Sequence, residues 1–189
     1  MIKGSHNSWT YLRPRKWWQR LISWTAQCQD KTITEQYKAG VRCFDLRIKR
    51  GKKGGLCIAH GLVEYEISEE VLHGQLSTLD LYGGVSIRVL HEIRREEENT
   101  PQELNWFRDM CSFLECRFTN IKFFCGRNLI DWQVDYFFGT EELSIEDAYG
   151  SVRKPKTIFA LFPRLYEWLY NKIEIERGTD KDVLLMDFV

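Results

Sequence analysis

Two histidines, an arginine and two aspartates are the residues of this sequence best suited to do chemistry together. His6 lies in GSHNSWTY and His60 in IAHG, while Asp45 and Arg47 are two residues apart in RCFDLRI. One imidazole can remove a proton from an attacking hydroxyl, and the other can protonate a leaving oxygen. An arginine can stabilise charge that develops on a phosphoryl group. This combination suits displacement at a phosphodiester, with Asp187 as a carboxylate that could orient one imidazole.

The elements that must position these residues alternate between strand and helix along the chain. VRCFDLRI, VSIRVLHEIR and NIKFFCGR are rich in β-branched and aromatic residues, whereas ISEEVLHGQLSTLDLY and TPQELNWFRDMCSFLECRF have helical periodicity. Such alternation is typical of a parallel α/β fold, and we expect five or six parallel strands. An eight-stranded barrel usually needs ~250 residues. The sequence therefore predicts a compact, incomplete TIM-type (β/α) barrel that covers residues 1–189 as a single domain.

In such a fold the carboxyl ends of the strands line one shared face, where the chemistry takes place. His6 follows the first strand, MIKGSH. Because side chains alternate along a strand, Asp45 and Arg47 should point to the same side. Asp187 lies in the terminal strand, DVLLMDFV. If the sheet brings its last strand beside its first, Asp187 should approach His6.

The remaining elements are predicted from turn and capping signals. We expect a helix whose first turn contains Pro14 and which carries Trp17 and Trp18. In KTITEQYKAG, a capping box of Thr32 and Glu35 predicts a second helix. The glycine-rich segment KRGKKGG predicts a hairpin that returns through LCIAHG, and KTIFAL and FPRLYEWLYNKI predict a further strand and helix.

Composition and charge exclude several classes of protein. Lys and Arg together number 27, as do Asp and Glu, so no overall field favours nucleic acid, and we expect no nucleic-acid partner. The six cysteines show no C-x-x-C spacing, which indicates reduced thiols and gives no sign of a zinc site. Apolar runs are far shorter than the roughly 18 residues that span a bilayer. With no signal-peptide pattern at the start, a cytoplasmic or peripheral membrane location is expected.

The segments GSHNSWTY, EQYKAGVRCFDLRI and IAHG, in this order and spacing, resemble the catalytic X region of phosphatidylinositol-specific phospholipase C. The terminal LLMDFV resembles the last strand of that family. The resemblance implies a PLC-like phosphodiesterase fold. It also implies cleavage of a phospholipid or another inositol phosphodiester by intramolecular attack, which gives a cyclic inositol phosphate and diacylglycerol.

The resemblance assigns a role to each candidate residue. It implies that His6 is the general base for the inositol 2-hydroxyl, His60 the general acid for the diacylglycerol oxygen, and Asp187 the group that orients His6. Asp45 and Arg47 match the D-x-R pattern of the bacterial branch, which uses no metal. The resemblance therefore favours a bacterial, metal-independent type of enzyme in which Arg47 binds the phosphate.

Two positions depart from that branch and leave an alternative open. Asn7 stands where bacterial enzymes usually have an aspartate, and Glu92 falls near a strand position that is lysine in that branch. Both are expected to contact the substrate, but Asn7, Asp45 and Glu92 could instead supply oxygen ligands to Ca²⁺. Against this, the guanidinium of Arg47 would repel the ion. Glu92 could also simply pair with Arg47, and Asp45 with Arg47 could be only a buried ion pair.

The role of one helix and the function itself also leave alternatives open. RPRKWWQRLISW mixes basic residues with Trp17, Trp18 and Trp24, so this helix could contact a membrane or pack its tryptophans on the core. His73 and His91 are expected to be structural. The rival functions are a metal-dependent glycerophosphodiester phosphodiesterase and a catalytically silent module that binds an inositol phosphate or a membrane.

Overall fold

One sheet, with nine strands in the described part of the chain, organises the protein. The computed structural model describes residues 1–51, 54–92, 100–128, 134–138, 145–147 and 182–189. The strands are β1 (Ile2–Ser5), β2 (Cys43–Arg50), β3 (Leu56–His60), β4 (Val63–Tyr65), β5 (Val85–His91), β6 (Ile121–Asn128), β7 (Val134–Phe138), β8 (Ile145–Asp147) and β9 (Val183–Met186). The helices are α1 (Trp17–Ile22), the 3-10 helix η1 (Ser23–Thr25), α2 (Ile33–Lys38), α3 (Glu69–Tyr82) and α4 (Pro101–Arg117).

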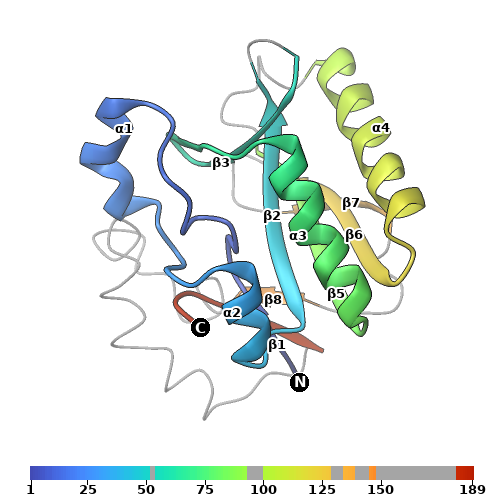
Figure 1. Ribbon diagram of the computed structural model, residues 1–189. Coiled ribbons are helices and arrows are strands. Elements are labelled where there is room, and N and C mark those ends of the chain that lie inside the picture. Colours follow the sequence, from blue (N-terminus) through green and yellow to red (C-terminus); the bar gives the residue numbers. More distant parts are fainter. Residues whose placement is uncertain (52–53, 93–99, 129–133, 139–144, 148–181) are drawn as a thin grey trace.

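The main path of the sheet runs β7-β6-β5-β2-β1-β9-β8. From β6 to β8 each strand is parallel to its neighbours, which makes six parallel strands within the described part of the chain. β7 is antiparallel to β6, and β3 and β4 form an antiparallel extension of β2. Figure 1 shows α3 and α4 lying along this sheet. The predicted α/β fold, a compact and incomplete barrel, is confirmed.

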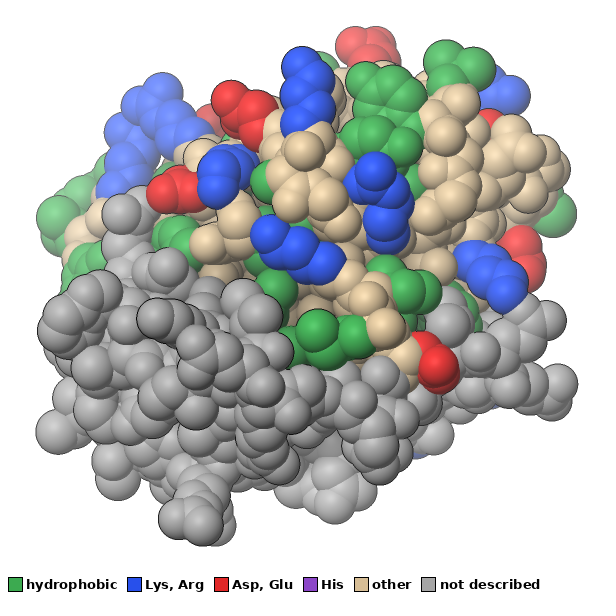
Figure 2. All heavy atoms as spheres, turned by 90° about the horizontal axis from the view of Figure 1, so that it is seen from below, with side chains coloured by type: hydrophobic (Ala, Val, Ile, Leu, Met, Phe, Trp, Pro, Cys, Tyr) green, Lys and Arg blue, Asp and Glu red, His purple; other side chains and the backbone are tan. Residues whose placement is uncertain are grey.

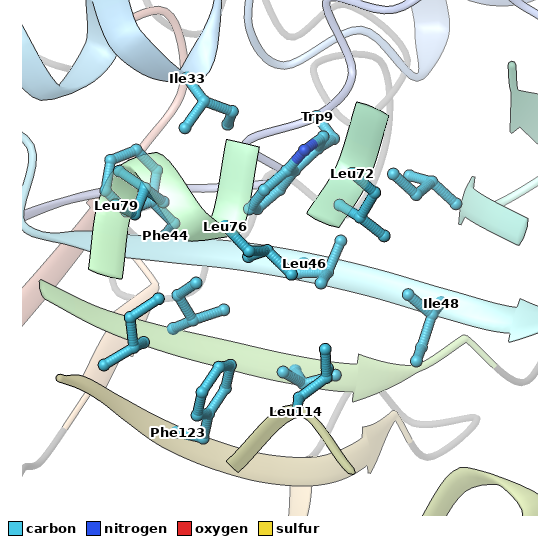
Figure 3. Close-up of a cluster of buried hydrophobic side chains, with 14 of the residues drawn as sticks. Trp9, Ile33, Phe44, Leu46, Ile48, Leu72, Leu76, Leu79, Leu114 and Phe123 are labelled. Carbon is cyan, nitrogen blue, oxygen red and sulfur yellow. The ribbon is translucent and has the colours of Figure 1, made fainter. Parts of the chain in front are cut away.

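The main core lies between the sheet and its helices. On β2, Phe44, Leu46 and Ile48 are fully buried and belong to one hydrophobic cluster with α3 and α4. Figure 3 shows these side chains on the side of the strand that faces Leu76 of α3. The intervening residues of β2 therefore point to the opposite, inner side of the sheet. That alternation places the polar pair of β2 away from the helices.

The helix that was predicted to start with Pro14 begins later, at Trp17, so this boundary was wrong. Pro14 forms an isolated bridge with Tyr65, and the amide of Arg15 donates to the carbonyl of Glu64 at 2.8 Å. The chain before α1 is thus extended along β4. Pairing with a neighbouring strand outweighs the local preference of proline for a first helical turn.

Other local predictions are confirmed. Thr32 and Glu35 form the capping box of α2, and Gly40 follows that helix with a φ of 92°. β3 returns antiparallel to β2, as the glycine-rich turn predicted. β4, β7 and β8 were not predicted, and the strand and helix expected in 156–173 lie outside the described residues.

Two observations concern membrane-spanning segments and the distribution of surface charge. Within the described residues, no helix is both long and apolar enough to cross a membrane. Figure 2 shows one face of the molecule, on whose described part Lys and Arg side chains are spread among hydrophobic and acidic ones. This distribution agrees with the equal numbers of basic and acidic residues.

Gly4 allows β1 and β9 to approach closely. A Cβ at this position would clash with Leu185 Cδ2 and lie 3.2 Å from the Leu184 carbonyl oxygen. We expect Gly4→Ala to lower the free energy of unfolding by about 1–3 kcal/mol, because the added methyl group would overpack the contact between β1 and β9. Gly74, in α3, is a matched control, since a Cβ there meets nothing within 4 Å. Gly74→Ala should leave stability unchanged or raise it by about 0.5–1 kcal/mol.

Urea unfolding followed by tryptophan fluorescence measures both changes. Equal stability of the Gly4→Ala variant and the unchanged protein would show that the β1–β9 contact tolerates a side chain.

Candidate active site

His6 and Asp187 meet because the first and last strands are paired. β1 and β9 are parallel, with Ser5 opposite Met186, so His6 and Asp187 leave the sheet side by side. His6 Nδ1 lies 2.7 Å from Asp187 Oδ1, and both side chains are buried. The proximity predicted for these two residues is therefore observed.

A buried glutamine fastens the ends of these two strands together. Gln29 Nε2 donates to the carbonyl oxygens of His6 at 3.0 Å and Met186 at 2.9 Å. Its Oε1 accepts from the amide of Val189 at 3.2 Å. Gln29 was missed in the sequence, where it belongs to no motif and contacts residues far away along the chain. Its role is to hold the segment that carries Asp187 against the segment that carries His6.

The contacts of His6 determine where its proton lies. Nε2 is 2.7 Å from Arg47 Nη2 and 3.0 Å from Asn7 Nδ2. A guanidinium can only donate, so Nε2 must be the acceptor nitrogen. The hydrogen is then on Nδ1 and is donated to the Asp187 carboxylate. This is the tautomer that a general base acting through Nε2 requires.

Asp45 is held between two arginines on the inner side of the sheet. Its Oδ2 accepts from Arg47 Nε at 3.1 Å and from the amide of Asn7 at 3.0 Å, and its Oδ1 accepts from Arg88 Nε at 2.9 Å. Burial alone would raise the pKa of the Asp45 carboxyl, but the two guanidiniums outweigh burial and hold the pKa well below its usual range. Asp45 and Arg47 point the same way, as the period of the strand predicted. Arg88, from β5, was not singled out in the sequence.

Glu92 contacts both the arginine and the loop of the second histidine. Its Oε2 is 3.7 Å from Arg47 Nη1, and its Oε1 accepts from the amide of Gly61 at 2.8 Å. The pairing of Glu92 with Arg47, left open by the sequence, is thus observed. Gly61 has a φ of 56°, a conformation that glycine adopts without strain.

His60 faces His6 across the centre of the site. The two ring centroids are 5.8 Å apart and the ring planes are nearly perpendicular, at 83°. His60 Nδ1 lies 2.8 Å from the carbonyl oxygen of Ala26, which can only accept, so Nδ1 carries a hydrogen. Burial, and then the positive charge of Arg47, lower the pKa of His60, while Glu92 acts in the opposite direction.

A cysteine to which the sequence assigned no role also lies in this cluster. Cys28 is buried, and its Sγ is 3.7 Å from His60 Nδ1 and 3.8 Å from Asn7 Nδ2. Burial, reinforced by the negative charge of Asp187, raises the pKa of this thiol well above its usual value. The sequence gave no sign of this position, because Cys28 lies in an irregular segment outside the quoted motifs.

The other two histidines lie among aromatic side chains on the helical side of the sheet. The ring of His91 stacks on Phe107 with centroids 5.0 Å apart, and the ring of His73 lies 5.6 Å from that of Phe113. Both positions agree with the structural role expected for these residues.

The opposing effects of Arg47 and Glu92 on the pKa of His60 give a prediction that can be tested without substrate. We expect its imidazole to titrate below about 6.5, the ordinary value for histidine. Glu92→Gln should lower that pKa further, because it removes a negative charge that favours the protonated ring. Glu103→Gln, at a carboxylate on α4 that pairs with Arg50, is the control and should change nothing. Histidine NMR signals followed against pH report the pKa, and a rise in the Glu92→Gln variant would contradict the geometry.

Comparisons with known proteins concern the family and the fold. Residues 2–79 match the family model described as phosphatidylinositol-specific phospholipase C, X domain. No curated protein matches the chain.

Several solved structures share its fold. The phosphatidylinositol-specific phospholipase C of Listeria monocytogenes is 15% identical, with a TM-score of 0.57 over 99% of this chain and 87% of that one. A mutant of the Staphylococcus aureus enzyme is 14% identical, with a TM-score of 0.62 over 99% of this chain and 84% of that one. At this level of identity the likeness shows the fold alone. The resemblance inferred from the motifs is therefore confirmed: residues 2–79 match the phosphatidylinositol-specific phospholipase C X domain, and the chain has the fold of the bacterial enzymes.

Proposed function

We propose that this protein is a phosphodiesterase that cleaves a phosphatidylinositol-type phosphodiester by intramolecular attack. The observation that carries the proposal is the arrangement around His6. Its Nδ1 is bound to Asp187, its Nε2 is oriented by Arg47, and a second imidazole faces it at 5.8 Å between centroids. A base, an acid and a fixed positive charge thus surround one point, as in-line displacement at phosphorus requires.

The reaction begins at His6. Nε2 takes the proton of the inositol 2-hydroxyl as that oxygen bonds to phosphorus, and Asp187 stabilises the resulting imidazolium. The bond from phosphorus to the glycerol oxygen breaks, and protonated His60 gives that oxygen its proton. The products are a cyclic inositol phosphate and diacylglycerol. Arg47, which lies against Nε2 in the free protein, would bind the phosphoryl oxygens.

Metal independence is part of the proposal. Two of the three residues considered as calcium ligands have oxygens that are already engaged: both Asp45 oxygens accept from arginines, and Glu92 pairs with Arg47. The Asn7 amide nitrogen is directed at His6. A calcium ion would need these oxygens to leave their partners and would lie close to a guanidinium that repels it. Arg47 supplies the positive charge instead.

Asn7 and Glu92 are proposed to contact the inositol ring. Asn7 reaches the substrate side of His6, and Glu92 reaches the loop that begins with Gly61. A carboxylate there can accept hydrogen bonds from ring hydroxyls but repels additional phosphates. This favours a headgroup without further phosphorylation near Glu92.

Phosphorus NMR of the protein with phosphatidylinositol micelles tests the reaction directly. We expect a cyclic phosphodiester signal both in the presence of chelator and with added calcium. His6→Ala should reduce the rate at least ~10²-fold, because the base is lost. His73→Ala, a matched substitution on α3, should retain activity.

The possible results separate the proposed activity from its rivals. A product seen only with calcium would indicate a metal-dependent phosphodiesterase. Binding of an inositol phosphate without turnover would indicate a silent module. Full activity of the His6→Ala variant would exclude the two-histidine mechanism.

Peripheral contact with a membrane is the second part of the proposal. Trp17 is 73% exposed and Trp18 39%, so the alternative in which both pack on the core is not supported. Figure 1 places α1 at the edge of the molecule, apart from α3 and α4. Leu21, on the same helix, is 69% exposed, and the basic Arg20 lies in the last turn. Exposed aromatic residues beside a cation are typical of a helix that lies in a lipid interface.

Vesicle co-sedimentation tests this contact. The double variant Trp17→Ala with Trp18→Ala should bind phosphatidylinositol-containing vesicles at least ~10-fold more weakly, because less apolar area reaches the interface. Leu81→Ala is the control, since Leu81 is an exposed apolar residue on α3. Equal vesicle binding by both variants would place the lipid contact elsewhere.

A further inference from the structure

The thiol of Cys28 forms a potential metal site with two residues of the proposed base. One ligand atom each from His6, Cys28 and Asp187 lies within 4.8 Å of the others, and all three residues are buried. Imidazole nitrogen, thiolate sulfur and carboxylate oxygen are the ligands that zinc prefers. Neither the proposed mechanism nor the sequence motifs gave Cys28 a function.

The distances suit a tetrahedral ion after a small adjustment. With Zn–S near ~2.3 Å and Zn–N or Zn–O near ~2.0 Å, ligand atoms around tetrahedral zinc are roughly 3.3–3.6 Å apart. The contact of 2.7 Å between His6 and Asp187 would open, and the sulfur would move inward. Three protein ligands would leave the fourth position for water.

The charges determine on which side of His6 the ion would lie. Arg47 is 2.7 Å from Nε2 and repels a cation there. Nδ1 faces Asp187, whose carboxylate together with a Cys28 thiolate balances the two charges of the ion. His60 keeps its Nδ1 hydrogen on Ala26 and is not needed as a ligand. This site also differs in chemistry from the calcium alternative, because a sulfur ligand disfavours calcium and favours zinc.

We propose that His6, Cys28 and Asp187 bind Zn²⁺ or another thiophilic divalent ion and that this ion inhibits the protein. On binding, the thiol proton of Cys28 passes to solvent and the imidazole hydrogen moves from Nδ1 to Nε2, so the donors of Arg47 and Asn7 must turn away from Nε2. The ion thus takes the place of the hydrogen that His6 donates to Asp187. It therefore competes with the arrangement that makes His6 a base. Inhibition rests on the proposed function, whereas binding of the ion does not.

Titration of the purified protein with Co²⁺ tests binding without reference to activity, because a cobalt–thiolate bond gives a charge-transfer absorption. We expect this band in the unchanged protein, and we expect Zn²⁺ to displace Co²⁺ and abolish it. Cys28→Ser should remove the band and weaken Zn²⁺ binding at least ~10-fold, as loss of a ligand does. Cys116→Ser is the matched control, since Cys116 is exposed and lies on α4.

Each result has a definite meaning. A band that persists in Cys28→Ser but disappears in Cys116→Ser would place the metal on the surface and overturn the site, as would the absence of any band. If Cys28→Ser does not fold, Asp187→Asn provides the test and should weaken Zn²⁺ binding.

A second readout is the phosphodiester assay. Zn²⁺ should inhibit the unchanged protein and the Cys116→Ser variant, whereas the Cys28→Ser variant should be at least ~10-fold less sensitive to Zn²⁺. A protein that binds Co²⁺ through Cys28 but cleaves no phosphodiester would contradict the proposed function and leave the metal site standing.

Discussion

The parallel pairing of β1 with β9 is the contact on which the site depends. It joins residues at opposite ends of the sequence, in register from Ile2 with Val183 to Ser5 with Met186. Only this pairing sets the His6 imidazole 2.7 Å from the Asp187 carboxylate. Closing so large a loop costs conformational entropy. The cost is offset by the buried inner contacts of Val183 and Leu185 and by the hydrogen bonds of Gln29.

A second constraint is the buried charge on the inner side of the sheet. Four charged residues are buried there and their formal charges sum to zero: Asp45, Arg47, Arg88 and Glu92. Burying such groups is costly unless they are paired, and removing one partner would leave an uncompensated charge. The network therefore fixes Arg47 in one orientation before any substrate binds. In the proposed reaction Arg47 would exchange its contact with His6 Nε2 for the phosphoryl oxygens, while Asp45 and Glu92 continue to balance its charge.

These two constraints meet at the short segment that follows β1. Asn7 has a φ of 46°, which turns the chain so that its amide reaches Asp45 and its side chain reaches His6. Ser8 continues the connection, because its Oγ accepts from the amide of Asp45 at 2.8 Å. His6 and the charged network are thus joined through backbone as well as side chains, which limits their relative motion.

Local sequence patterns were sufficient to predict most helices and strands. They were insufficient where backbone that is distant in sequence competes with the local preference. The capping box of α2 could be predicted because Thr32 and Glu35 interact within one turn. The start of α1 was misplaced because Pro14 is held by Tyr65, a partner that no window around Pro14 contains. Gln29, Cys28 and Arg88 were missed for the same reason. Each acts on residues that are remote in sequence, and no spacing rule connects them.

The sequence by itself determined the types of residue available for chemistry and the order of strands that carry them. Its motifs were specific enough to single out His6, Asp45, Arg47 and His60 as candidates, and its alternation of strand and helix was enough to predict a parallel sheet. Only the tertiary structure decided the tautomer of His6, the pairing of Glu92 with Arg47 and the position of Cys28. Each of these depends on distances between atoms of different strands and loops. Such distances are set by how the sheet curves and packs, which no local pattern encodes.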